Sequence, residues 1–135
     1  MVKCLGDGGI SIRALCLADT GQFGVARFIV DDHARARTVL HDAGFTVKEA
    51  VVIAVEVEDR PGGLADVLVP LVEQDMSVEY VYCYLGKLKE KAVVIIRVDE
   101  AEQAIGALKV AGYRLIPPEE LYGMQESHGS GSQEN

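Results

Sequence analysis

The sequence predicts an α+β fold made of two related modules, of which the N-terminal one is incomplete. Short β-branched runs alternate with helical stripes of apolar residues, which indicates a mixture of strands and amphipathic helices. From residue 51 onward the order is strand, helix, strand, strand, helix, strand, which is the ferredoxin-like βαββαβ arrangement with both helices on one sheet face. Much of this order also occurs before residue 51, so the chain carries the module twice.

The first module is expected over residues 1–50. The runs at 10–19 and 25–31 are β-branched and apolar enough to be strands. A helix is predicted after them, because four apolar residues fall at i, i+3, i+4 and i+7 on one helical face: Ala36, Val39, Leu40 and Ala43. Gly44 is a typical helix terminator, and a short extended piece is expected at 45–50.

The second module is expected over residues 51–118. Its strands are predicted at 51–58, 77–85, 91–98 and 113–117. Its two helical stripes consist of Leu64, Val67, Leu68, Leu71 and Val72, and of Ala101, Ala104, Ile105 and Leu108. Pro70 lies inside the first of these helices, where proline costs about 3 kcal/mol, but it falls outside the apolar stripe. Residues 119–135 are expected to form a disordered tail, because Gly, Ser, Gln and Glu dominate there.

The internal repeat is the firmest prediction about the fold. ISIRALCLAD matches MSVEYVYCYL when Ile10 is aligned with Met76, an offset of 66. VARFIVDD then matches VVIIRVDE, and DAGFTV matches VAGYRL, both at an offset of 68. The offset grows by two because the second hairpin is two residues longer, at a position where insertions are tolerated.

The two copies are unequal, because the stretch DRPGGL at 59–64 occurs once. The offset of the repeat would place its counterpart before Met1, so the first copy begins inside its first helix and lacks its first strand. In a βαββαβ sheet that strand is central, and without it ladder hydrogen bonds lack partners on both sides. Two explanations stay open: a chain start later than the start of the full module, or a strand supplied by a swapped copy or a partner.

Composition and charge argue against several classes of function. A net charge of −8 with a pI near 4.8 disfavours nucleic-acid binding, which needs clustered Lys and Arg. No apolar run approaches the roughly 20 residues of a membrane span. Three cysteines without CxxC spacing disfavour a disulfide scaffold or zinc site and favour a cytoplasmic location. No catalytic or cofactor motif is present, so we expect no enzyme activity, no cofactor and no metal.

The stretch DRPGGLADVL joins a predicted strand to a predicted helix. Pro61 presets φ for a turn, and Gly62 and Gly63 let the backbone approach a ligand closely. The free N–H groups and positive dipole end of the helix suit a carboxylate or a phosphate. An ordinary tight turn without a ligand explains the same residues equally well. Neither GxGxxG nor GxxxxGK[ST] occurs, so nucleotide binding by those routes is unsupported.

These features resemble the ACT domain, a small-molecule-binding regulatory module. The resemblance rests on a strand that ends in an acidic residue, then DRPGGLADVL, then DMSVEYVYCYLG, with GGISIRALCLADTGQFGVARFIVDD in the first copy. It is similar to stand-alone tandem ACT proteins and covers about residues 3–117, with two modules packed side by side. The resemblance implies an amino-acid site at the interface of the modules, formed by Asp59, Arg60, Pro61, Gly62, Gly63 and Leu64 with Ile12, Arg13 and Ala14.

We therefore expect a cytoplasmic, non-enzymatic protein that senses an amino acid, forms a homodimer or binds an enzyme partner, and contacts neither nucleic acid nor membrane. In this interpretation Asp59 holds the α-amino group, and the N–H groups near Gly62, Gly63 and Leu64 face the carboxylate. The alternative is a regulatory subunit that pairs with a biosynthetic enzyme through its sheet edges and has no ligand of its own.

Overall fold

The computed structural model describes residues 1–19, 21, 24–88 and 91–123. The chain divides into two compact units, unit 1 at 1–50 and unit 2 at 51–135, and each is described here by itself. Each unit contains an antiparallel sheet and helices, so the α+β class predicted from the sequence is confirmed.

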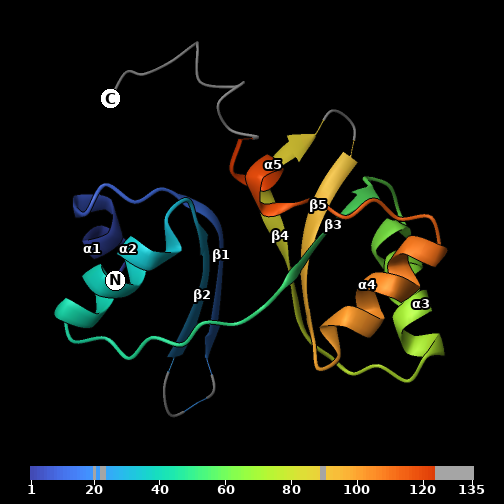
Figure 1. Ribbon diagram of the computed structural model, residues 1–135, viewed down its shortest axis with the longest axis horizontal. Helices are drawn as coiled ribbons and strands as arrows, with labels where there is room; N and C mark the ends of the chain where they lie inside the picture. Colours follow the sequence, from blue (N-terminus) through green and yellow to red (C-terminus); the bar gives the residue numbers. More distant parts are fainter. Residues whose placement is uncertain (20, 22–23, 89–90, 124–135) are drawn as a thin grey trace. The chain divides into compact units, whose positions relative to one another are not determined.

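Unit 1 is a two-stranded hairpin covered by two helices (Figure 1). The strands β1 (Ile12–Asp19) and β2 (Gly24–Val30) pair antiparallel. The helices α1 (Val2–Asp7) and α2 (His33–Asp42) supply the other side of its core. The core consists of Leu5, Ile10, Val30, Ala36 and Leu40.

The helix α2 begins and ends at residues that the sequence marks. Asp32 is its N-cap and accepts a hydrogen bond from the Arg35 N–H at 3.0 Å, which satisfies one of the free donors of the first turn. Gly44 has a φ of +90°, so it adopts the left-handed conformation that follows many helix ends. The segment 45–50, which we expected to be extended, pairs with no strand among the described residues of unit 1.

Unit 2 contains a three-stranded antiparallel sheet in the order β3-β5-β4. The elements are β3 (Ile53–Glu58), α3 (Gly63–Glu73), β4 (Val78–Leu88), β5 (Lys91–Val98), α4 (Ala101–Val110) and α5 (Pro118–Gly123). A single bridge between Val55 and Leu115 adds the segment after α4 to the open side of β3. With this bridge, unit 2 has the complete βαββαβ order that the sequence predicts.

The helices α3 and α4 cover one face of this sheet (Figure 1). The core between the two layers includes fully buried Val55, Val67, Leu71, Ile96 and Leu108. The predicted helical stripes supply Val67, Leu71 and Leu108, and α3 continues through Pro70 without interruption. Val67 and Leu71 face the sheet on either side of that proline, which is itself partly exposed.

The expectation of a disordered tail from residue 119 is wrong for residues 119–123, because α5 begins at Pro118. Proline is well suited to the first turn of a helix, where its missing N–H is not needed. Leu121 is buried, and its carbonyl oxygen accepts a hydrogen bond from the Tyr84 hydroxyl at 2.6 Å. Arg114 also donates to both carboxylate oxygens of Glu120 at 2.6 Å. The remaining tail, 124–135, lies outside the described residues.

Candidate functional site

The stretch DRPGGL forms the connection between β3 and α3. Residues 59–62 make a tight loop, in which the Arg60 N–H donates to the Glu58 carbonyl and the Gly63 N–H donates to the Arg60 carbonyl, both at 3.0 Å. A Cβ placed on Gly63 would lie 2.1 Å from the Glu58 carbonyl oxygen, inside the hard contact distance. Glycine is therefore required at 63 by a contact within the chain, whereas the approach to a ligand that we predicted for Gly62 and Gly63 stays a prediction.

The other glycine of the loop sets the start of the helix. Gly62 is the N-cap of α3 and has a φ of +85°, a conformation that side chains disfavour. Its carbonyl accepts from the Asp66 N–H at 2.9 Å, which closes the first turn. No side chain caps this helix, and among the N–H groups of its first turn that of Gly63 already donates to the Arg60 carbonyl. Their charge suits an anion of carboxylate size.

Arg60 holds the loop against the helix. Its Nη1 donates to the Pro61 carbonyl at 3.0 Å and its Nη2 to the Asp66 carboxylate at 2.5 Å. Both charged side chains are about half exposed, so this ion pair fixes geometry more than it stabilises the unit. This ion pair could not be predicted from the sequence, because a separation of six residues across a turn matches no helical spacing. Arg60 thus links the loop to the first turn of the helix.

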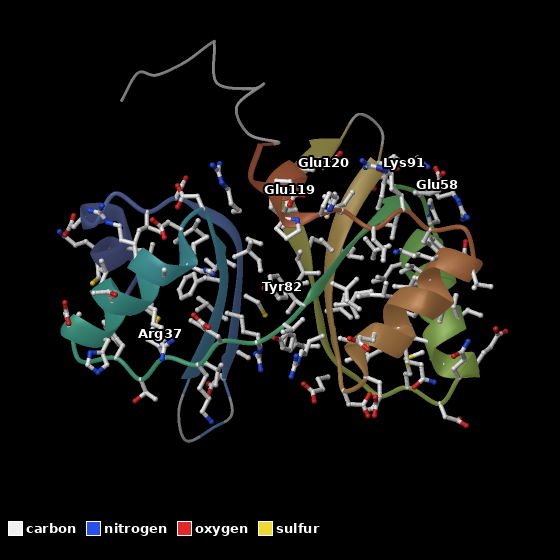
Figure 2. The ribbon with its side chains drawn as sticks, viewed as in Figure 1. Arg37, Glu58, Tyr82, Lys91, Glu119 and Glu120 are labelled. Carbon is white, nitrogen blue, oxygen red and sulfur yellow. The ribbon has the colours of Figure 1, made fainter. Side chains whose placement is uncertain are left out.

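An ion pair fixes the end of β3 from which the loop departs. Lys91 Nζ donates to Glu58 Oε1 at 2.5 Å, and Figure 2 shows both side chains at the same end of the sheet of unit 2. The Lys91 hydrogen bond and charge lower the pKa of Glu58, and the Glu58 hydrogen bond raises the pKa of Lys91. Each charge therefore favours the charged form of the other.

The other predicted site residues lie in unit 1, at the start of β1. Ile12 pairs with Val30 and Ala14 with Ile29, so Arg13 is the extra residue of a β-bulge. The same irregularity occurs in unit 2, where Glu79 stands at the equivalent position. We did not predict these bulges, although bulges often re-aim side chains next to functional sites.

Glu79 has a partner within its own unit. Its Oε2 accepts from the Nε of Arg97 at 3.2 Å, and Arg97 also donates to the Val51 carbonyl at 2.6 Å. In the repeat, Arg97 of unit 2 aligns with Ile29 of unit 1. The bulge residues Arg13 and Glu79 thus carry opposite charges. The arginine that bonds to Glu79 is replaced by isoleucine at the equivalent position of unit 1.

A tyrosine strip follows the bulge on β4. Val78 and Val81 pack against the helix-covered core, so alternation places Tyr80, Tyr82 and Tyr84 on the opposite face of the sheet. The rings of Tyr80 and Tyr82 lie 6.0 Å apart and are tilted by 34°. The three tyrosines therefore share one face of the sheet. Figure 2 labels Tyr82 on this sheet.

The part of the chain that the structure describes shows no metal site, no membrane-spanning helix and no disulfide. No group of three or more His, Cys, Asp or Glu residues there is arranged to hold a metal ion. None of the described helices is both long and apolar enough to span a membrane. The three cysteines form no disulfide. A shallow groove in unit 1 is lined by exposed side chains that include Arg37 and Glu49, 3.9 Å apart, and we assign no ligand to it.

The family whose sequence pattern is described as an ACT domain pair matches residues 1–124. The chain belongs to the ACT domain family. Among solved structures, this ACT pair is similar to protein BT0572 from Bacteroides thetaiotaomicron, with 31% sequence identity and a TM-score of 0.81. The match covers 90% of the chain described here and 83% of the BT0572 chain. No curated protein matches the chain.

The ACT pair therefore has a regulatory, ligand-binding role. The structure brings Asp59, Arg60, Pro61, Gly62, Gly63 and Leu64 together in one loop of unit 2. It brings Ile12, Arg13 and Ala14 together at one end of β1 in unit 1. The two sets belong to different units of the chain.

Proposed function

We propose that this ACT pair is a non-enzymatic sensor that binds a free amino acid between its two modules. The proposed contacts are Asp59, Arg60, Pro61, Gly62, Gly63 and Leu64 from one module, and Ile12, Arg13 and Ala14 from the other. The observation that carries the proposal is the contact of Gly63 with the Glu58 carbonyl oxygen, which holds an uncapped helix start at the end of a rigid loop.

Each end of an amino acid has a matching group in this arrangement. The first-turn N–H groups of α3 provide donors and positive potential for the α-carboxylate. The Asp59 side chain, on the exposed surface of the loop, supplies a carboxylate for the α-ammonium. In this proposal the side chain of the ligand lies toward the bulged start of β1.

The proposed mechanism is linkage between binding and module packing. A ligand that contacts both modules stabilises the arrangement in which the two sets of residues meet, by as much as its affinity differs between arrangements. A homodimer or a partner enzyme that binds one arrangement more tightly would respond to this change in the population of arrangements. The three unpaired cysteines support a reducing cytoplasm as the location.

Isothermal titration of the full chain against the standard amino acids tests the proposal. We expect one amino acid to give saturable heat, and Asp59→Asn to weaken its binding at least about tenfold, which corresponds to about 1.4 kcal/mol. Asp75→Asn is the matched control, because Asp75 lies at the opposite end of α3 with a φ of +55° that Asn tolerates. Absence of heat for every amino acid, with folded protein, would contradict the proposal.

The second candidate is a subunit that binds a biosynthetic enzyme and has no ligand of its own. It is favoured by unit 1, whose sheet has two strands and hence an open backbone edge among the described residues. Co-purification of a stoichiometric enzyme, together with flat titrations, would support this candidate over the sensor.

A further inference from the structure

The helix α3 carries a second apolar face besides the one that it buries. Its buried face consists of Gly63, Val67 and Leu71, which are four residues apart. A separate set of apolar residues follows the spacing i, i+3, i+4 and i+7, which also defines one face of a helix. We call this set the α3 stripe, and it consists of Ala65, Leu68, Val69 and Val72.

The α3 stripe is open to solvent, above all at its two valines. Val69 is 48% exposed and Val72 is 64% exposed. Ala65 is exposed as well, and Leu68 is partly buried at the margin of the core. Apolar residues that are exposed singly are normal in soluble proteins, whereas a contiguous apolar surface marks an interaction site. The stripe is such a surface, because its members are neighbours on one helix face.

The internal repeat shows that packing of the module does not require this stripe. The offset of 66 aligns α3 with α1, and the structure agrees, because Leu71 and its counterpart Leu5 are both 0% exposed. Valine is a weaker helix former than the charged residues usual at solvated positions of a helix. Unit 1 nevertheless has no valine at the positions that align with the two exposed valines, which pair as Val69 with Lys3 and Val72 with Gly6.

The side chains that surround the α3 stripe supply negative charge. Residues 61–86 contain no Lys and no Arg. The helices α3 and α4 lie side by side (Figure 1), and Gln103 Nε2 donates to Gln74 Oε1 at 3.5 Å where α3 ends and α4 begins. Four exposed carboxylates lie in this region, and none forms an ion pair among the described residues. We call them the acidic end, and they are Glu73, Asp75, Glu100 and Glu102.

The proline of α3 adds a hydrogen-bond acceptor to this surface. Pro70 has no N–H, so the Asp66 carbonyl, four residues earlier, lacks the donor that it would have in a regular helix. Pro70 is only partly buried, and Val69 beside it is exposed. The surface thus combines apolar side chains with carboxylates and a backbone acceptor, so a fitting partner brings donors and positive charge.

We infer that the α3 stripe binds a positively charged amphipathic helix of a partner protein. Two helices pack through interlocking ridges of side chains, so the partner presents apolar residues at i, i+3, i+4 and i+7. The helix α3 has 11 residues and is about 16 Å long, so a partner helix of about three turns covers it. Lys or Arg residues of the partner meet the acidic end and supply the charge that this surface lacks.

Charge makes two other occupants less favourable. A second copy of the chain would present the same stretch 61–86 without Lys or Arg, and each copy has a net charge of −8, so two such surfaces repel one another. Helices that lie on membranes carry Lys and Arg for the anionic headgroups, and α3 has neither. A cationic protein helix is the occupant that satisfies both the apolar stripe and the acidic end.

Titration of the full chain with a synthetic peptide tests the inference. The probe is a peptide of Leu, Ala and Lys, about four helical turns long, with leucine at i, i+3, i+4 and i+7 and lysine on the remaining face. We expect saturable shifts of the NMR amide signals of α3 and of the first turn of α4. The double variant Val69→Gln, Val72→Gln keeps the charge and the helix but should weaken binding at least about tenfold, which corresponds to about 1.4 kcal/mol. Val110→Gln is the matched control, because Val110 is an exposed valine of α4 outside the stripe, and affinity should not change.

The charge of the acidic end is tested separately. The double variant Glu73→Gln, Glu102→Gln should bind the peptide several-fold more weakly at low salt, and this difference should disappear in about 1 M NaCl. Glu119→Gln removes an exposed carboxylate of α5 and is the control, with unchanged affinity. A peptide of the same composition in scrambled order has no apolar face and should not bind.

Two results of the titration would overturn the inference: amide signals of α3 that saturating peptide leaves unshifted in the folded chain, and binding that Val69→Gln, Val72→Gln does not weaken. Sedimentation and vesicle binding examine the other occupants. A dimer of the parent that dissociates in this variant would overturn the inference in favour of a second copy. Binding to anionic phospholipid vesicles that is lost in this variant would overturn it in favour of a membrane. These substitutions lie outside 59–64, so the amino-acid titration stays a separate test of the proposed function.

Discussion

Gly63 contacts the carbonyl oxygen of Glu58 so closely that a Cβ on Gly63 would lie 2.1 Å from it. The last residue of β3 and the first residue of α3 thus touch through their backbones, and the loop between them has little freedom. This contact is within unit 2 and independent of any ligand. It makes the shape of the loop a property of the folded module.

Replacement of Gly63 by alanine should therefore disrupt the module. We expect Gly63→Ala to lower the free energy of unfolding by about 3 kcal/mol, because backbone must move to admit the methyl group. Gly106→Ala in α4 is the matched control, since a Cβ there meets nothing within 4 Å. The control should raise stability by up to about 1 kcal/mol through helix propensity. Urea unfolding of both variants measures the difference, and equal effects would refute the role given to Gly63.

Loss of the Arg60 side chain should affect binding more than stability. Arg60→Gln removes a half-exposed ion pair, so we expect the unfolding free energy to change by no more than about 1 kcal/mol. The loop loses its link to Asp66, so amino-acid affinity should fall several-fold in calorimetric titration. Lys3→Gln, which removes the exposed pair with Asp7 in unit 1, is the control and should leave affinity unchanged. Unchanged affinity in Arg60→Gln would show that the loop keeps its shape without the arginine.

The Glu58–Lys91 pair should give stability a dependence on pH. The pKa of Glu58 is lowered from 4.5 in the folded state, so its contribution is complete above pH 4.5 and is lost as pH falls through the folded-state pKa. The pKa of Lys91 is raised from 10.5, so its contribution is complete below pH 10.5 and is lost as pH rises through the folded-state pKa. Both groups are exposed, so the effect is small and falls with salt.

Thermal unfolding of Glu58→Gln across this pH range measures the effect. We expect the variant to have a lower melting temperature than the parent at neutral pH. This difference in melting temperature should disappear at low pH and in about 1 M NaCl. Adding Lys91→Gln to this variant should then change little, because the partner is already gone. A difference in melting temperature that is the same at all pH values would mean that the pair contributes nothing through its charges.

The hydroxyl of Tyr84 should hold α5 in place. Tyr84→Phe removes its hydrogen bond to the Leu121 carbonyl at 2.6 Å, and because the residue is buried we expect a loss of about 1 kcal/mol. The same substitution in a chain that ends at residue 117 should cost much less, since the acceptor is absent. Chemical denaturation of the four proteins gives this comparison. An equal loss in both chains would assign the effect to the sheet and not to α5.

The elements that depend on local pattern could be predicted from the sequence. The apolar stripe of α3 identified buried Val67 and Leu71, and the Pro-Gly-Gly run located the tight loop. The internal repeat further predicted that the two modules are equivalent, which no single stretch of the sequence indicates. The family match over residues 1–124 agrees with that prediction.

The features that depend on partners distant in sequence could not be predicted. The bulges at Arg13 and Glu79 are a matter of register between strands, and register does not follow from one strand alone. The helix α5 lies in a polar segment and is fixed by Tyr84, 37 residues before its acceptor. The extended segment at 45–50 has the right residues for a strand but pairs with no neighbouring strand among those described.

The described chain carries the DRPGGL loop once, and this has a consequence for how its response to a ligand is measured. Under the proposed function this loop contributes one site. Titration of that site in an isolated chain should therefore give a hyperbolic saturation curve with a Hill coefficient of one. Any steeper curve would then report the association of chains, which makes the Hill coefficient a direct readout of assembly.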